Sequence, residues 1–269
     1  MIALKKFKIF RSGFKNHFLQ HYIDLIIVFT QKDLKVRYKN SFLGYLWSVA
    51  HPLAFAVVFY VAFKLIVRIP TENYALFLIC GLFPWQWFAN SLNASPMIFL
   101  GNAQLIKKVN FPRNIIPFTL VLQDMIHFVL AIPVITAFLL FSGMKPHLLW
   151  LVGIPILIIA QFCLVYGICL MIASLNLFFR DLERVTTIFT TILFYITPVF
   201  FPETMIPSKY QFIMKLNPLT PLIINWRNLF MNGVLQLDNI VLSVCYGIVF
   251  LAVGLIVYRN LSWRFAEVL

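Results

Sequence analysis

Three ionisable side chains lie in long apolar stretches of this sequence, where they could bind or pass protons: His51, Asp124 and His127. Asp124 and His127 are three residues apart, so a helix would place them on one face, as a proton relay requires. Ion-driven transporters usually hold several such groups at membrane depth. Because Asp124 is the single acidic residue inside a predicted span, the pattern favours a pairing with a basic group or a wet cavity over proton-coupled transport.

Sequence patterns for nucleotide or metal chemistry are missing from the chain. Neither the P-loop pattern nor the dinucleotide fingerprint of spaced glycines occurs, so we expect no ATP hydrolysis by this chain alone. The cysteines lie in apolar stretches without metal-ligand spacing, which predicts neither a disulfide nor a zinc site. We therefore expect no catalytic residues, no metal and no cofactor bound by the chain itself. These cysteines are Cys80, Cys163, Cys169 and Cys245.

The composition is that of an integral membrane protein. Hydrophobic residues make up 61% of the chain and charged residues 12%, and the mean hydropathy is +0.88. Soluble domains carry about 25% charged residues. This chain has too little polar surface to cover a water-facing globule, so we predict an all-α fold that spans a membrane.

The net charge of +13 is distributed as in a membrane protein. Nine of the 22 Lys and Arg residues precede residue 40, which by the positive-inside rule places the N-terminus in the cytoplasm. This placement argues against nucleic acid as a partner.

Apolar runs long enough to cross a bilayer predict six spans. Six spans return the C-terminus to the cytoplasm and put sixteen Lys and Arg residues inside against five outside, with Lys64 near the outer end of the first span. The predicted spans are 42–67, 75–96, 114–142, 148–176, 185–201 and 238–258.

Two segments do not fit the pattern of simple spans. Residues 17–31 carry polar side chains on one stripe and apolar ones elsewhere, which predicts an amphipathic helix in the inner interface; a short extra span is the alternative. Residues 198–237 are apolar but interrupted by Pro202, Pro207, Pro218 and Pro221. They predict two re-entrant helices, 206–216 and 221–232, dipping in from the outer face, or else an amphipathic outer loop.

Two motifs stand out at predicted membrane boundaries. Residues 37–47 (RYKNSFLGYLW) change within a few positions from basic and polar to apolar, at the start of the first span. Residues 102–113 (NAQLIKKVNFPR) combine an apolar side with a basic one between spans two and three. Such a segment could dock on a soluble partner, or it could be a basic loop that only anchors the topology.

The order of motifs along nearly the whole chain resembles ABC-2 type permeases that export polysaccharides and polyol phosphates. Besides the two motifs above, the resemblance includes GLFPWQWF (81–88), FRDL (179–182), YITPVFFP (195–202) and NPLTP (217–221), with Arg227 downstream. Each is weak alone, but together and in order they are specific to the family. The pattern near Pro202 departs slightly, reading Phe-Phe before it.

The resemblance implies a permease homodimer that works with two P-loop ATPase chains, which hold ATP and Mg. The cargo would be a lipid-linked polysaccharide, O-antigen above all, with capsule or teichoic acid as alternatives, crossing the bacterial inner membrane. The implied ATPase-coupling residues are Lys107, Lys108, Phe111, Pro112, Arg113, Arg180 and Asp181. The junction motif at the first span is represented by Arg37, Tyr38, Ser41, Gly44 and Trp47.

A long glycan needs a tunnel that keeps its hydroxyls out of contact with the hydrocarbon of the membrane. Aromatic rings in the tunnel wall can stack on sugar faces and still let the polymer slide. The alternative is that these rings only pack or anchor at the interface. The candidates for the path are Tyr60, Trp85, Trp87, Phe88 and Tyr195, and those for an outer gate are Pro198, Asn217, Pro218 and Arg227.

We divide the chain into a cytoplasmic N-terminus with the interface helix (1–40) and a six-span domain (41–269). Two other classes of protein compete with the permease interpretation. A membrane glycosyltransferase would need acid–base residues in its outer loops, where only Glu72, Glu203 and His147 occur. A proton-coupled secondary transporter would need more ionisable groups at membrane depth.

Overall fold

The computed structural model describes residues 17–37, 44–109 and 111–268, and within these ranges every element is a helix. In chain order the elements are α2 (His17–Arg37), η2 (Gly44–Leu46), α3 (Trp47–Phe59), the π-helix η3 (Tyr60–Ile66), α4 (Tyr74–Ala94), α5 (Ile98–Gly101), α6 (Ala103–Lys108), α7 (Ile115–Phe141), α8 (Trp150–Asn176), α9 (Leu182–Ile196), η4 (Glu203–Met205), α10 (Ser208–Leu216), α11 (Leu219–Asn232), α12 (Leu237–Leu261), η5 (Ser262–Arg264) and α13 (Phe265–Val268).

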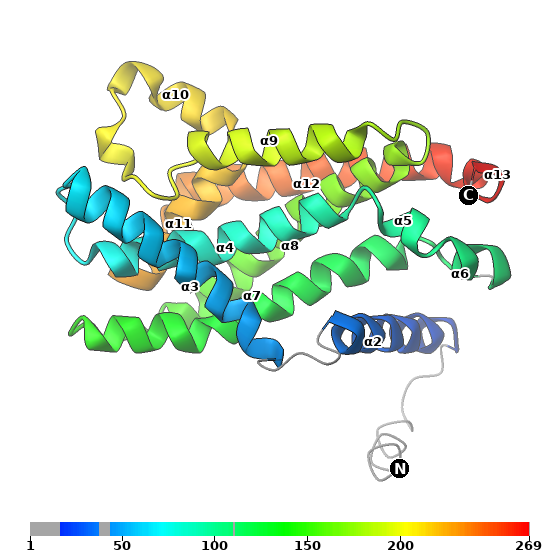
Figure 1. Cartoon of the computed structure of the whole chain (residues 1–269), viewed down its shortest axis with the longest axis horizontal. Helices are drawn as coiled ribbons and strands as arrows, with labels where there is room; N and C mark the ends of the chain where they lie inside the picture. The colour runs from blue at the N-terminus through cyan, green and yellow to red at the C-terminus, as the bar shows by residue number, and fades with distance from the viewer. Residues whose placement is uncertain (1–16, 38–43, 110, 269) are drawn as a thin grey trace, which may run out of the picture.

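Long apolar helices run side by side along the main axis of the molecule (Figure 1). Among the described residues, five stretches are long and apolar enough to cross a membrane. They match five of the six predicted spans, because each is a run of about 20 apolar residues bounded by polar turns. These stretches are Val49–Ile66, Tyr74–Ala94, Ile115–Phe141, Trp150–Asn176 and Leu237–Arg264.

The predicted fifth span, 185–201, forms a shorter helix than expected. α9 has 15 residues, which at 1.5 Å per residue is about 22 Å, less than the roughly 30 Å of a hydrocarbon core. Helix formation stops at Thr197, which is extended because Pro198 disfavours the helical conformation of the residue before it. The count of six spans therefore stays a prediction.

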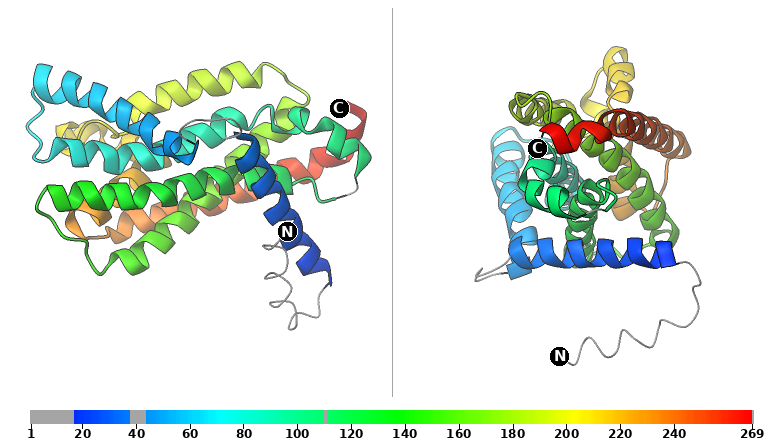
Figure 2. Two further views of the ribbon diagram at one scale, coloured as in Figure 1. Left: turned by 60° about the horizontal axis from the view of Figure 1, so that its bottom comes forward. Right: turned by 90° about the vertical axis from the view of Figure 1, so that its right-hand side faces the viewer.

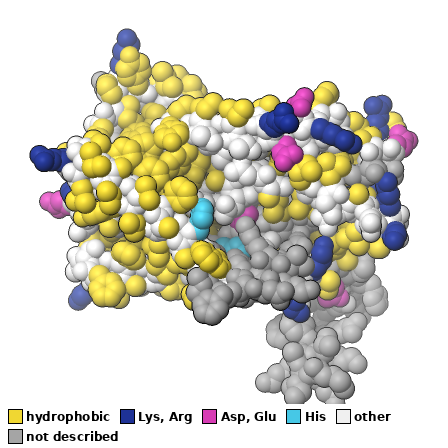
Figure 3. Space-filling model, viewed as in Figure 1, with side chains coloured by type: hydrophobic (Ala, Val, Ile, Leu, Met, Phe, Trp, Pro, Cys, Tyr) yellow, Lys and Arg dark blue, Asp and Glu magenta, His cyan; other side chains and the backbone are white. Residues whose placement is uncertain are grey.

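The two ends of the bundle collect different segments. α5, α6, the turn before α9 and the C-terminus lie at one end, which we name the inner end after the prediction; the turns 67–73 and 142–149, together with α10, lie at the other, the outer end (Figure 1). Lys and Arg side chains gather over the inner end, whereas the opposite half of this face is largely hydrophobic (Figure 3). The connecting segments predicted to lie inside are therefore at one end of the bundle, and those predicted to lie outside are at the other.

Helix α2 lies crosswise to the bundle at the inner end, as the end-on view in Figure 2 shows. It has 21 residues and ends at Arg37, six residues beyond the predicted end of the interface helix. α2 packs against α7, and Phe29 from α2 is buried there. A helix that lies across the others fits the prediction of a helix lying in the membrane interface.

Helices α8 and α12 approach each other more closely than any side chain would permit. A Cβ atom added at Gly254 would lie 2.2 Å from the carbonyl oxygen of Gly167, and one at Gly167 would lie 2.4 Å from the Phe250 carbonyl. Small residues at a crossing point allow membrane helices to bring their backbones together. These two glycines therefore fix α12 directly on α8.

The helices predicted at 206–216 and 221–232 form as α10 and α11. α10 is exposed along most of its length, whereas α11 is buried between α4, α8 and α12. Trp226 on α11 is fully buried, and its indole nitrogen donates a hydrogen bond to Gln161 on α8 at 2.7 Å. α11 is thus part of the protein core rather than a surface loop.

Candidate functional site

The predicted coupling segment forms part of the inner end, with its basic and apolar sides separated. Lys107 and Lys108 end helix α6 with exposed side chains, while Ile106 is buried. Phe111 is also buried, with its ring 5.4 Å from that of Phe29 on α2. The lysines therefore present charge outward, and Phe111 attaches the segment to the interface helix.

A set of hydrogen bonds ties the start of α7 to three other elements. The Arg113 guanidinium donates to the Ser262 carbonyl oxygen at 2.8 Å. The Asn114 side-chain amide donates to the Tyr22 hydroxyl at 3.0 Å, and its backbone N–H donates to the Tyr258 hydroxyl at 3.1 Å. The segment after Lys108 is thus bonded to α2, α12 and η5, so that its position depends on all three.

The second predicted coupling element follows α8 at the same end. Arg180 and Asp181 are both exposed, and Pro112 is half-buried beside the first element. The buried Asn176 side chain donates to the Pro96 carbonyl oxygen at 2.8 Å, joining the end of α8 to the segment that leads into α5. The structure therefore brings both groups of predicted coupling residues to one end of the molecule.

A cavity of about 580 Å³ separates α2 from this coupling segment. Its walls come from α2 (Leu25, Phe29, Lys32) and from residues 100–105, 109 and 111. Lys32 donates to the Asn102 side-chain oxygen at 3.2 Å across the gap. The crosswise helix and the coupling segment are therefore joined at several points but not packed solidly.

The junction motif is described in part. Arg37 ends α2, whereas Tyr38 and Ser41 lie outside the described residues. Gly44 has a φ of 50°, a left-handed conformation that glycine adopts without strain. Trp47 begins α3 with an exposed ring, as expected for an aromatic side chain at a membrane boundary. The glycine permits the turn from the polar stretch into the first long helix.

The predicted path aromatics divide into buried and exposed rings. Trp85, Trp87 and Phe88 are at most 4% exposed and belong to the hydrophobic core of this chain. Tyr60 is half-buried, and Tyr195 on α9 is 61% exposed. Within a single chain Tyr195 is the most accessible of the five rings; that the set lines a path stays a prediction.

The buried rings connect to α9 through a chain of aromatic contacts. The ring of Trp85 lies 5.3 Å from that of Phe194, which lies 5.4 Å from Phe59 on α3 and 5.6 Å from Phe200. Tyr195 meets Phe200 at 6.2 Å. Such pairs stabilise packing beyond their buried area. α3, α4 and α9 therefore share one aromatic cluster that reaches the surface at Tyr195.

The predicted gate residues converge at the outer end of the bundle. Arg227 is buried, and its terminal nitrogen donates to the carbonyl oxygens of Pro198 and Val199 at 2.8 and 2.9 Å. Asn217 is buried as well and donates to the Thr197 hydroxyl at 2.8 Å, while Pro218 starts α11 next to it. The segment that follows α9 is thereby tied to the start of α11 and to a residue within that helix.

The charge of Arg227 is held in an apolar setting. Its guanidinium carbon lies 3.6 Å from the centre of the Phe77 ring, a cation–π contact. The guanidinium stays charged, because arginine is not deprotonated in proteins. A charge in this position strengthens the hydrogen bonds to the two carbonyl oxygens.

Two residues of this cluster escaped the sequence-based predictions. A Cβ at Gly81 would lie 2.9 Å from the Arg227 guanidinium and 3.0 Å from the Val199 oxygen, so the glycine makes room for both. The Tyr74 hydroxyl donates to the Phe200 carbonyl oxygen at 2.6 Å. Gly81 was visible as the first residue of the GLFPWQWF motif, but nothing in the sequence pointed to Tyr74.

The three ionisable residues of the apolar helices lie in two different settings: Asp124 and His127 are buried on α7, and His51 is exposed on α3. Asp124 is 2% exposed and accepts a hydrogen bond from the Ser91 hydroxyl at 2.8 Å. His127 is buried, whereas His51 is exposed on α3, with its ring 5.0 Å from that of Phe55. The described contacts give Asp124 a partner within the core.

Comparisons with known proteins agree with this architecture. The sequence model of ABC-2 type transporters matches residues 24–231. An O-antigen export system permease protein, RfbA, from Klebsiella pneumoniae is 50% identical over 251 residues, covering 93% of this chain and 97% of that protein. RfbA from Myxococcus xanthus is 30% identical, covering 79% of this chain and 82% of its own.

A more distant relative has a different cargo in its name. The polysialic acid transport protein KpsM of Escherichia coli is 24% identical over 237 residues, covering 85% of this chain and 90% of that protein. The family model covers more than half of the chain, and the matched region contains the coupling segment, the aromatic cluster and Arg227. The chain therefore belongs to the ABC-2 type transporter family, as an integral membrane permease.

Proposed function

We propose that this chain is the permease subunit of an ATP-driven exporter that moves a lipid-linked polysaccharide, O-antigen first among the candidates, across the bacterial inner membrane. The observation that carries the proposal is the 50% identity to an O-antigen export permease over 93% of the chain. A match over 251 of the 269 residues spans both ends of the bundle, so the compared region includes the coupling segment as well as the outer cluster.

In the proposed topology both termini face the cytoplasm and α9 completes six spans. The residues that follow α9 are buried between other helices, where non-helical backbone is tolerated at membrane depth. α2 lies in the inner interface, and α10 and α11 dip in from the outer side. The concentration of basic side chains at the inner end supports this orientation (Figure 3).

The inner end is the proposed docking surface for two P-loop ATPase subunits, which bind ATP and Mg and carry out hydrolysis. Lys107 and Lys108 are exposed there together with Arg180 and Asp181. Phe111 and Arg113 connect the segment to the rest of the chain. The Phe111 ring packs on Phe29 of α2, and Arg113 donates a hydrogen bond to Ser262. Movement of the ATPases would then be passed to the crosswise helix and to the start of α7.

Two copies of the chain are proposed to enclose the polymer between them. α9 exposes an apolar face that includes Val185, Ile188, Phe189 and Ile192, with Tyr195 at its outer end. A second copy would cover such a face. Tyr195 would then lie at the interface between the two copies, where a sugar could stack on its ring. Arg227 would set the outer opening, since it holds the residues that follow α9.

The experiment is complementation of a bacterial strain that makes the polysaccharide but lacks its permease. Expression of this chain with the P-loop ATPase of the same exporter should restore polymer at the cell surface, and an ATPase variant unable to hydrolyse ATP should not. Surface polymer that returns without any ATPase would contradict the proposal and favour a proton-coupled transporter.

A capsular polysaccharide is the second candidate cargo, favoured by the similarity to KpsM. The same strain panel separates the two, because lipopolysaccharide and capsule are detected by different antibodies. Restoration of capsule alone would reassign the cargo without changing the class of protein.

A further inference from the structure

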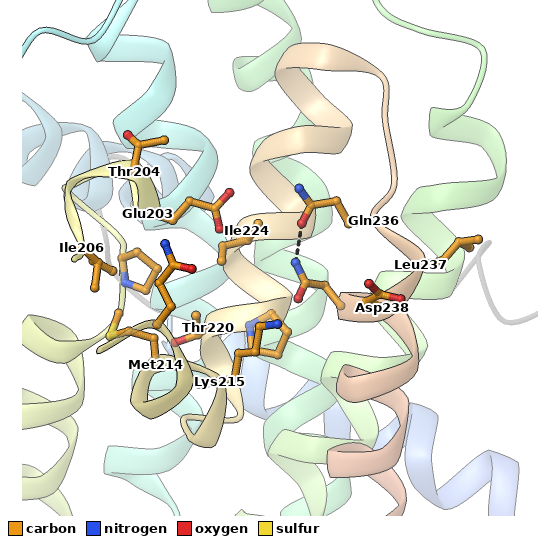
Figure 4. A pocket seen from close by; sticks show the side chains of 14 residues that line it. Glu203, Thr204, Ile206, Met214, Lys215, Thr220, Ile224, Gln236, Leu237 and Asp238 are labelled. Atoms are coloured by element: carbon orange, nitrogen blue, oxygen red, sulfur yellow. Dashed lines mark hydrogen bonds between the residues drawn. The ribbon is translucent and has the colours of Figure 1, made fainter. Parts of the chain in front are cut away.

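A cavity of about 690 Å³ opens at the outer end, between η4, α10, the start of α11 and the start of α12 (Figure 4). Its volume lies in the range of cavities that hold small ligands, about 300–1,000 Å³. Carboxylates from Glu203 and Asp238 and amides from Gln211, Gln236 and Asn239 line its walls. Four successive segments between residues 198 and 239 thus contribute hydrogen-bonding groups to one space.

Thr220 supplies an independent sign that the cavity takes a ligand. Its side chain is 3% exposed, lines the cavity, and has no hydrogen-bond partner for its hydroxyl among the described residues. A buried polar group without a partner is costly, and natural proteins usually pair such groups. A hydroxyl on a bound molecule would provide the missing partner.

The chemistry of the lining selects a neutral, polyhydroxylated ligand. Carboxylates accept hydrogen bonds, amides both accept and donate, and a threonine hydroxyl does both, which suits the paired hydroxyls of a sugar. The two carboxylates outnumber the one cation, Lys215, so the local charge disfavours phosphate and uronic acids. Neutral hexoses and deoxyhexoses meet all these conditions.

We propose that this cavity is a saccharide-binding subsite that holds a neutral sugar unit of the glycan as it leaves the outer end. The proposal rests on the proposed export function. Pro198, whose carbonyl oxygen accepts a hydrogen bond from Arg227, is also part of the cavity wall. A bound sugar therefore lies against the segment that Arg227 holds, next to the outer opening.

The test is saturation-transfer-difference NMR on the full chain in lipid nanodiscs. The probes are the methyl glycosides of glucose, galactose, mannose and rhamnose, with methyl glucuronide as the anionic probe. Thr220→Val keeps the side-chain shape and removes the hydroxyl, and Glu203→Gln removes one carboxylate. Glu72→Gln is the matched control, because Glu72 is an exposed carboxylate in an outer-end turn that does not line the cavity.

At least one neutral glycoside should bind the unaltered chain, and methyl glucuronide should bind more weakly. Thr220→Val should weaken binding about fivefold, the worth of one net hydrogen bond, without lowering the melting temperature. Equal binding in Thr220→Val and Glu72→Gln, or preference for the glucuronide, would overturn the subsite. The absence of any glycoside signal would overturn it as well. The surface-polymer assay tests the proposed export function separately.

Discussion

Replacing Gly81 by alanine should loosen the outer cluster through Arg227. The new methyl group would stand 2.9 Å from the guanidinium and 3.0 Å from the Val199 oxygen, closer than carbon normally approaches either atom. Hydrogen bonds of charged groups contribute about 1.5–3 kcal/mol each, and Arg227 donates two to this segment. Partial loss of both, set against the roughly 1 kcal/mol that alanine gains over glycine in a helix, leaves a destabilisation of about 1–3 kcal/mol.

The measurement is the apparent melting temperature of the purified protein in detergent. A loss of this size lowers the melting temperature by about 2–12 °C for a chain of this length. Gly101→Ala is the matched control, because a Cβ there meets nothing within 4 Å. The double variant Gly81→Ala with Arg227→Met should lose less stability than the sum of the two single variants, since part of the effect of Gly81→Ala runs through Arg227. Equal melting of Gly81→Ala and Gly101→Ala would refute the reasoning.

Three further predictions concern the inner end and the aromatic rings. Lys107→Glu should reduce ATPase binding and polymer export without lowering the amount of protein in the membrane, as measured by co-purification and surface polymer. Phe111→Ala should destabilise the chain by about 3 kcal/mol, since it removes a buried ring that packs on α2, and a thermal melt checks this. Trp87→Ala should impair assembly while Tyr195→Ala spares it and lowers export, because the first ring is in the core and the second is exposed.

Each of these predictions has a matched comparison. Lys145→Glu changes an exposed lysine at the outer end and should leave ATPase binding intact. Trp87→Phe should assemble normally, because the indole N–H of Trp87 has no partner among the described residues and phenylalanine keeps most of the buried ring. Full export by Tyr195→Ala would remove this ring from the path, and unchanged melting of Phe111→Ala would show that the segment does not depend on α2.

The helices themselves were largely predictable from the sequence. The span predicted at 114–142 is α7, Ile115–Phe141, and that at 148–176 is α8, Trp150–Asn176, because long apolar runs have no other stable form in a bilayer. Pro198 explains why the fifth helix ended early: a count of apolar residues ignores the restriction that a proline places on the residue before it.

The contacts between distant segments were not predictable in the same way. Gly81 and Arg227 meet although 146 positions separate them, and a single sequence carries no signal of such a pairing. The aromatic rings illustrate the same limit. Trp85 and Tyr195 are both aromatic side chains in apolar helices, yet one is buried by its neighbours and the other is exposed. Hydropathy identifies a helix but does not say which face is covered by protein.

The close approach of α8 and α12 also has a consequence for biosynthesis. Gly167 leaves a notch on α8 that is filled by the backbone around Gly254, and 87 residues separate the two glycines. At translation rates of about 5–20 residues per second, α8 waits roughly 4–17 seconds in the membrane before its partner emerges from the ribosome. A nascent chain is therefore incomplete until its last long helix arrives, and chains truncated before α12 would expose the notch to membrane proteases and chaperones.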